Sequence, residues 1–69
     1  MIMRLFINSK FENVPEEVRT LSELTEYLKI KKEGTGVGIN GRLIPSREWN
    51  TVPLKEDDRI IIITAAYGG

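Results

Sequence analysis

Cysteine and histidine are both absent from this chain of 69 residues. Their absence excludes disulfides, thiol nucleophiles, imidazole bases and zinc fingers. Net charge is also lacking, because ten basic and ten acidic residues cancel. This balance argues against a nucleic-acid binder that relies on a strong basic field. We therefore expect no catalytic residue, no metal site and no nucleic-acid partner.

Long hydrophobic runs are absent as well. The longest uninterrupted apolar run is the set of isoleucines at 60–63, whereas a membrane-spanning helix needs about 20 apolar residues. The first residues do not resemble a signal peptide, because the charge of Arg4 follows almost at once. We expect no membrane contact and, given the lack of cysteine, a cytoplasmic location.

Length and hydrophobic content predict one compact domain over residues 1–69. A hydrophobic fraction of 41% is compatible with a globular core. A chain this short buries only about 60% of its unfolded surface, so its core has to be efficient. We expect residues 65–69 to form a flexible C-terminal tail of that domain.

The N-terminal half predicts a hairpin followed by a helix. Residues 1–7 and 11–14 are rich in β-favouring side chains and flank polar turn residues at 8–10. A helix is predicted over 20–31, because a threonine followed three residues later by a glutamate forms a capping box and leucines recur at helical spacing. Gly34 is the expected stop signal of this helix.

The C-terminal half predicts a second hairpin, over 36–45, and a last strand over 59–65. Asn40-Gly41 is the expected hairpin turn, because both residues tolerate the positive φ of a type I′ turn. Residues 46–49 suit a helical turn. In the polar stretch that follows, Leu54 is expected to reach the core.

The predicted order ββαβββ contains a single helix. One helix can cover only one face of a sheet, so we predict a two-layer α+β domain with a mixed sheet of four to five strands. The first and last strands are the most apolar and are expected to lie centrally. Trp49 is expected to be half-buried beside Pro45 rather than to stack on a ligand.

The four isoleucines of the last strand point to a possible surface for a partner. Side chains alternate across a strand, so we assign Ile60 and Ile62 to the core and the other two to the open face of the sheet. Ile61 and Ile63 would be joined there by Phe6 of the first strand. An exposed apolar patch of this kind typically marks a partner site. The alternative is that a loop over 50–58 covers it.

The chain ends in Tyr67-Gly68-Gly69, after small uncharged residues. Glycine lacks a Cβ, so such a tail can pass close to the backbone of another protein and enter a narrow channel. The carboxylate of Gly69 becomes reactive when a partner enzyme couples it to AMP from ATP, and a sulfur donor can then displace AMP to leave a thiocarboxylate. The chain has no P-loop of its own. The alternative is a frayed end without a role.

Several segments spread along the chain form a recognisable combination. They are Ile39-Asn40-Gly41-Arg42-Leu43-Ile44-Pro45, Arg47, Trp49, Leu54, Asp57-Asp58, Ile60 to Ile63 and Gly68-Gly69. This combination resembles the ThiS family of sulfur carriers in thiamine thiazole biosynthesis. Members typically show an I-N-x-x-x-V-P-R-x-x-W type segment, an L-x-x-G-D turn and a terminal Gly-Gly. Ser46, Asp57 and Tyr67 depart from that pattern, Asp57 by standing where glycine is usual.

The resemblance implies a β-grasp (ubiquitin-like) fold and a thiocarboxylate at Gly69, with Gly68 and Tyr67 in the working tail. It implies no bound cofactor, since ATP is used by the partner enzyme. The implied partners are a ThiF-like adenylyltransferase, a ThiG-like thiazole synthase and a sulfur donor protein. The residues that carry over as partner contacts are Phe6, Ile61 and Ile63.

Three other functions remain open at this point. A MoaD-like carrier, which delivers sulfur to the molybdopterin precursor, shares the fold, the tail and the chemistry. A ubiquitin-like modifier would instead join Gly69 to lysines on target proteins. A plain interaction module would make no use of the glycines. An enzyme is the least favoured, because no histidine or activated lysine accompanies the hydroxyl groups.

Overall fold

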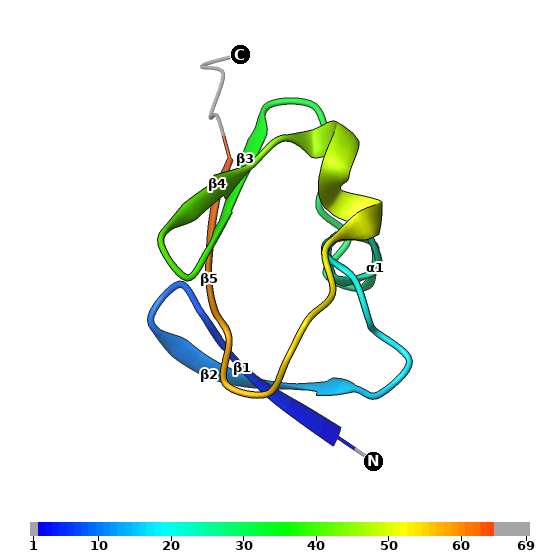
Figure 1. Ribbon diagram of the computed structural model, residues 1–69, viewed down its shortest axis with the longest axis vertical. Helices are drawn as coiled ribbons and strands as arrows, with labels where there is room; N and C mark the ends of the chain where they lie inside the picture. Colours follow the sequence, from blue (N-terminus) through cyan, green and yellow to red (C-terminus); the bar gives the residue numbers. More distant parts are fainter. Residues whose placement is uncertain (1, 65–69) are drawn as a thin grey trace.

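The computed structural model describes residues 2–64. The elements are β1 (Ile2–Ile7), β2 (Lys10–Pro15), α1 (Leu21–Tyr27), β3 (Thr35–Ile39), β4 (Arg42–Ile44), the 3-10 helix η1 (Ser46–Thr51) and β5 (Arg59–Thr64). The strands form one mixed sheet in the order β2-β1-β5-β3-β4, with β5 parallel to β1 and antiparallel to β3. Figure 1 shows α1 and η1 on the same side of this sheet. The predicted two-layer α+β fold is confirmed, and the first and last strands are interior as expected.

The first hairpin has a tighter turn than the sequence predicted. Asn8 and Ser9 have φ of 49° and 68°, which is the left-handed pair that a two-residue type I′ turn requires. Lys10 is therefore the first residue of β2 rather than a turn residue. This register places Phe6 directly opposite Phe11.

The helix begins as predicted but ends earlier. The side chain of Thr20 accepts from the backbone of Glu23, whose carboxylate accepts from the backbone of Thr20, so the capping box is confirmed. The prediction that the helix continues to residue 31 and stops at Gly34 is wrong. Lys29 has a φ of 60°, and the Ile30 N–H donates to the Thr25 carbonyl at 2.8 Å, which closes the helix as a Schellman motif.

Apolar side chains from every layer meet between the sheet and α1. The buried set includes Leu5, Ile7, Val14, Val37, Ile60 and Ile62 from the strands, and Leu21, Leu24, Trp49 and Leu54 from the other layer. Trp49 is 1% exposed and its Nε1 donates to the Ile44 carbonyl at 2.9 Å. The expectation of a half-buried tryptophan is wrong, because a backbone carbonyl inside the domain satisfies its only polar atom.

The stretch between η1 and β5 runs along the helix side of the sheet. The Leu54 N–H donates to the Arg19 carbonyl at 2.8 Å, and the Leu21 N–H donates to the Val52 carbonyl at 3.2 Å. Figure 1 shows this yellow-to-orange segment on the same side as α1. The alternative in which this stretch covers the open face is therefore wrong. Within the described part of the chain, no helix is long and apolar enough to cross a membrane.

Candidate docking face and the strand that leads to the tail

The alternation of β5 separates two pairs of isoleucines. Ile60 and Ile62 are 1% and 9% exposed, whereas Ile61 and Ile63 are 55% and 66% exposed. The predicted division between core and open face is confirmed. Because β5 is the central strand, the exposed pair lies in the middle of the uncovered sheet.

A groove with a glycine floor runs beside the exposed isoleucines. Gly38 and Gly36 of β3 lie opposite Ile61 and Ile63, and Leu43 of β4, itself 76% exposed, lies opposite Gly38. Because the glycines project no side chain, the branched side chains stand on either side of a hollow of about 220 Å³. The result is an apolar groove in the open face of the sheet.

Gly36 has room for a side chain that it does not carry. A Cβ built at this position meets no atom within 4 Å, and its φ lies outside the left-handed region. Folding therefore does not require glycine here. Glycine within a strand weakens it and commonly marks a place where another backbone or ligand approaches closely. The groove is therefore a candidate site at which another chain or a ligand approaches the sheet closely.

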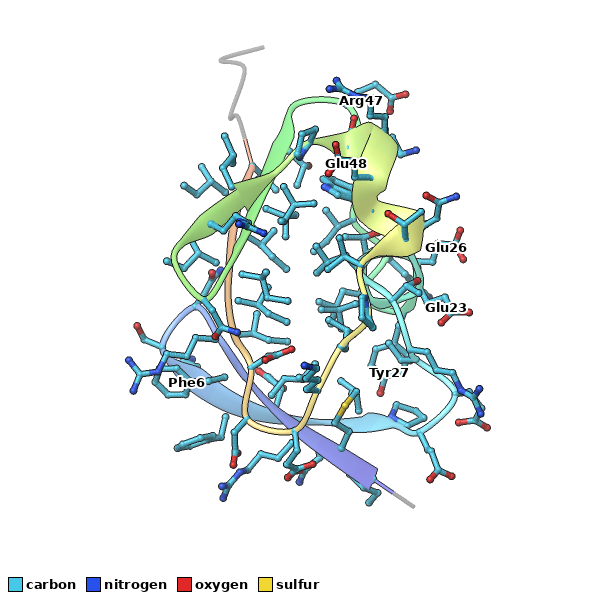
Figure 2. All side chains as sticks on the ribbon, in the orientation of Figure 1. Phe6, Glu23, Glu26, Tyr27, Arg47 and Glu48 are labelled. Carbon is cyan, nitrogen blue, oxygen red and sulfur yellow. The ribbon has the colours of Figure 1, made fainter. Side chains whose placement is uncertain are left out.

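Phe6 lies on the open face, but at the other end of it. It is opposite Arg59 on β5, and Figure 2 shows its ring pointing away from α1. The ring packs on Phe11 with 4.7 Å between centroids. Phe6 lines a hollow of about 230 Å³, separate from the groove that Ile61 and Ile63 line. The structure thus places the three predicted contact residues on one face but in two neighbouring hollows.

Two arginines flank the aromatic pair. The Arg4 guanidinium carbon lies 4.8 Å from the Phe11 ring centroid, and that of Arg59 lies 5.8 Å from the Phe6 centroid. Both distances are within the range of cation–π attraction. Arg4 Nε also pairs with Asp57 Oδ1 at 2.8 Å, and this hydrogen bond raises the pKa of the Arg4 guanidinium. Arg4, Phe11, Phe6 and Arg59 thus follow one another as cation, ring, ring and cation, with the two rings tilted by 56°; we call this row the cation–aromatic stack.

Asp57 occupies the position where the ThiS motif usually has glycine. Its φ is 67°, a left-handed conformation that glycine adopts at no steric cost. The Asp57 N–H donates to the Arg4 carbonyl at 2.7 Å, and the carboxylate pairs with the Arg4 side chain. Compared with glycine, aspartate at position 57 adopts this φ at a steric cost, but it adds an ion pair with Arg4 beside the stack.

Two asparagine side chains hold β5 at its two margins. Asn8 donates through Nδ2 to the Ile62 carbonyl at 3.1 Å and accepts from the Ile62 N–H at 2.8 Å. Asn40 Oδ1 accepts from the Arg59 N–H at 2.9 Å, and the Asn40 backbone N–H donates to the Arg59 carbonyl at 2.7 Å. The side-chain amide of Asn8 thus acts as a peptide group that extends the neighbouring strand. The position of Thr64, at the end of β5, is thereby fixed relative to the sheet.

The predicted tail residues Tyr67, Gly68 and Gly69 lie outside the described residues. β5 leads directly toward them, since Thr64 pairs with Thr35 as the last residue of the strand. The groove and the path to the tail therefore share one strand.

The buried carboxylate among the described residues, that of Asp58, supports the fold. Asp58 is 9% exposed. Its carboxylate accepts from Asn40 Nδ2 at 3.0 Å and from the Lys55 N–H at 2.8 Å, so it holds the turn before β5. Over residues 2–64, no group of three or more acidic side chains converges as a metal site would require.

Sequence reasoning missed six residues of this face. They are Gly36, Gly38, Leu43, Arg4, Phe11 and Arg59. The alternation of Gly-x-Gly in β3 opposite the isoleucines would have revealed the groove once the pairing of β3 with β5 was assumed. A two-residue turn at 8–9 would have placed Phe11 opposite Phe6.

Two comparisons with known proteins point to one family. The family model described as the ThiS family matches residues 3–69. A crystal structure of the thiamine biosynthesis protein ThiS from Geobacter metallireducens superposes with a TM-score of 0.82 at 25% sequence identity, over 97% of this chain and 100% of that one. A search of curated proteins finds no match.

Proposed function

Because the chain belongs to the ThiS family, we propose that it is a sulfur carrier of thiamine biosynthesis whose Gly69 carboxylate is converted into a thiocarboxylate by partner enzymes. The carrier itself supplies no catalytic group. Its contribution is a face that a partner can bind and a tail that a partner can modify.

The reaction proceeds in two displacements at the Gly69 carboxyl group. The carboxylate oxygen attacks the α-phosphorus of ATP and pyrophosphate leaves, which gives an acyl adenylate. A hydrosulfide equivalent from the sulfur donor protein then attacks the carbonyl carbon. AMP leaves with its electron pair, and the tail ends in a thiocarboxylate. An adenylyltransferase of the ThiF type would catalyse the first step, and a thiazole synthase of the ThiG type would receive the sulfur.

The observation that carries this proposal is the continuity of β5. Ile61 and Ile63 face the glycine-floored groove, and the same strand ends at Thr64 with five residues left before the terminal carboxylate. Five extended residues span at most about 17 Å. A partner seated on the groove would therefore have the terminal carboxylate within reach of an active site on the same partner.

Rigidity at the end of β5 supports the same function. The amide of Asn8 bonds both polar backbone groups of Ile62, two residues before the end of the strand. A fixed starting point reduces the volume that the tail has to search, and pre-organisation of this kind raises affinity by lowering the ordering cost. Phe6 extends the apolar area of the face beyond the groove.

The direct test is the mass of the intact chain after reaction. The full chain is incubated with the ThiF-like enzyme of the same organism, ATP and a sulfur source. We expect a gain equal to the exchange of one oxygen for one sulfur, located at Gly69 by fragmentation. A variant lacking Gly68 and Gly69 is the matched control and should gain nothing.

Three outcomes would redirect the assignment. An unchanged mass of the wild-type chain would contradict the carrier function. Conjugates between Gly69 and lysines of other proteins would identify a modifier. Transfer of the sulfur to a molybdopterin precursor, with none to the thiazole, would identify the MoaD-like alternative.

A further inference from the structure

We propose that Arg59 is an ionic anchor of the docking face, and that it pairs with an aspartate or glutamate side chain of the adenylating partner. The proposal rests on the carrier function for the identity of that partner. A contact through Arg59 would add an ion pair to a docking face whose other contact residues are apolar. The position of Arg59 would then determine where the partner carboxylate must lie.

One arginine of the hollow beside the cation–aromatic stack has no carboxylate partner among the described residues. It is lined by Arg4, Phe6, Phe11, Asp57 and Arg59. The single carboxylate among them, that of Asp57, is engaged with Arg4 at 2.8 Å. Among residues 2–64, Arg59 has no ion-pair partner. The Glu56 carboxylate also lies beside Arg4, where it accepts from the Arg4 backbone N–H at 3.1 Å and helps to raise the guanidinium pKa. Arg59 is therefore the arginine of the hollow that is left without a carboxylate.

Arg59 is held in a position suited to receiving that carboxylate. Its backbone N–H and carbonyl are both bonded to Asn40, at 2.9 and 2.7 Å, so the base of the side chain is fixed. The guanidinium lies over the Phe6 ring at 5.8 Å. A contact at this distance leaves the planar fork of N–H donors, which matches a carboxylate, available to a partner.

The geometry of β5 sets the spacing that the partner must match. Arg59, Ile61 and Ile63 share one face of the strand, with Arg59 before the exposed isoleucines. Successive residues on one face of a strand are about 7 Å apart, so Arg59 lies about 7 Å from Ile61 and about 13 Å from Ile63. The fitting partner is a protein whose apolar side chains enter the groove and whose carboxylate lies that far along the strand direction.

An unpaired arginine in a hollow next to an apolar groove distinguishes this partner from a second copy of the chain. In a symmetric pair the same patch faces itself, so each copy would offer the other a second unpaired arginine and no free carboxylate of the hollow. Such like-charge contact opposes association. The charge therefore favours a different protein with an acidic contact.

The test measures binding of the full chain to the adenylating enzyme by calorimetry, without ATP. We expect Arg59→Gln to raise the Kd about tenfold and Arg59→Glu to raise it about a hundredfold, because loss of a charge partner and then repulsion act in succession. Arg19→Gln is the matched control, since Arg19 is an exposed arginine that precedes α1 and lines neither hollow. It should change the Kd less than about twofold.

Two further measurements separate the anchor from a structural effect. Added salt should weaken binding of the wild-type chain more steeply than that of Arg59→Gln, because screening acts on the ion pair. Replacing the opposing partner carboxylate with arginine should restore binding to Arg59→Glu. Thermal unfolding of each variant checks that the domain is intact, and Arg59→Lys should bind better than Arg59→Gln.

The possible outcomes distinguish this inference from the carrier function. Arg59 variants that bind like Arg19→Gln, while the wild-type chain gains sulfur, would overturn the anchor alone. Binding that depends on Arg59, with no sulfur gained, would support the anchor and contradict the carrier chemistry. A wild-type chain that does not bind the adenylating enzyme would overturn both.

Discussion

The two faces of β5 use one residue type for opposite purposes. Ile60 and Ile62 point into the core and are almost fully buried, whereas Ile61 and Ile63 point outward and remain more than half exposed. Composition and strand propensity are the same for all four. What differs is only the parity of their position along the strand, because neighbouring side chains alternate across a sheet.

This comparison shows that stability and recognition can be separated residue by residue. The inward pair belongs to the same buried cluster as Trp49 and the leucines of the helical layer, so its burial stabilises the fold. The outward pair faces a groove whose floor is glycine, so its contribution to folding is small. A partner could bury the outward pair without any change in the packing of the inward pair.

The largest difference between the two faces is expected when neighbouring isoleucines are each replaced by alanine. Ile60→Ala should lower the free energy of unfolding by about 3 kcal/mol, because it leaves a cavity in a filled core. Ile61→Ala, the same change one residue later, should lower it by less than about 1 kcal/mol. Urea denaturation of both variants measures the difference. Equal losses would show that the open face is part of the folding core.

A substitution at Gly36 should move stability and binding in opposite directions. Gly36→Val places a branched side chain where no atom lies within 4 Å, and we expect a stability gain of about 0.5 to 1 kcal/mol from the better strand former. The same side chain fills the groove beside Ile63, so affinity for the adenylating enzyme should fall at least about tenfold. Calorimetry and urea denaturation report the two effects. A Gly36→Val chain that binds normally would exclude the groove as a docking site.

The side-chain hydrogen bonds from Asn8 to Ile62 should stabilise β5, which carries both the buried and the exposed isoleucines. Asn8→Gly removes the amide that bonds Ile62 and keeps a residue that adopts positive φ freely, so the free energy of unfolding should fall by about 1 to 2 kcal/mol. Ser9→Gly is the control, because Ser9 also has a positive φ but makes no comparable bond. It should be neutral or stabilising. Hydrogen exchange at the Ile62 amide should accelerate in Asn8→Gly alone.

The smallest expected effects lie at two residues in the left-handed conformation, Lys29 and Asp57. Lys29→Gly should stabilise the domain by about 1 kcal/mol, since glycine relieves the φ of 60° at the helix end. Asp57→Gly relieves a similar strain but loses the pair with Arg4, so its gain should be smaller. Thermal unfolding compares the two. A larger gain from Asp57→Gly would mean that the Arg4 pair does not stabilise the folded chain.

Patterns that repeat locally were predictable from the sequence. The alternation of the four isoleucines, the capping box at Thr20 and the Asn40-Gly41 turn each depend on residues close together in the chain, and the structure confirms all three. The five-stranded fold followed from the element order and from the resemblance to ThiS. The local sequence patterns and the resemblance to the ThiS family predicted the same arrangement of strands and helix.

Features that depend on distant contacts were not predictable in the same way. The helix ends at a lysine in the left-handed conformation, where glycine is the usual signal, so its length was overestimated. Burial of Trp49 depends on a carbonyl of β4 that accepts its N–H. The cation–aromatic stack joins β1, β2 and β5, and only the register of all three strands brings Arg59 beside Phe6.

The place of β5 in the sheet also has a mechanical consequence. Hydrogen bonds in the ladders lie across the strand axis, and β5 has such bonds to β1 on one margin and to β3 on the other. A pull on Thr64 along that axis would load both ladders in shear at the same moment, rather than peel them apart one bond at a time. A force applied through the end of β5 would therefore be resisted by the ladders to β1 and β3 together.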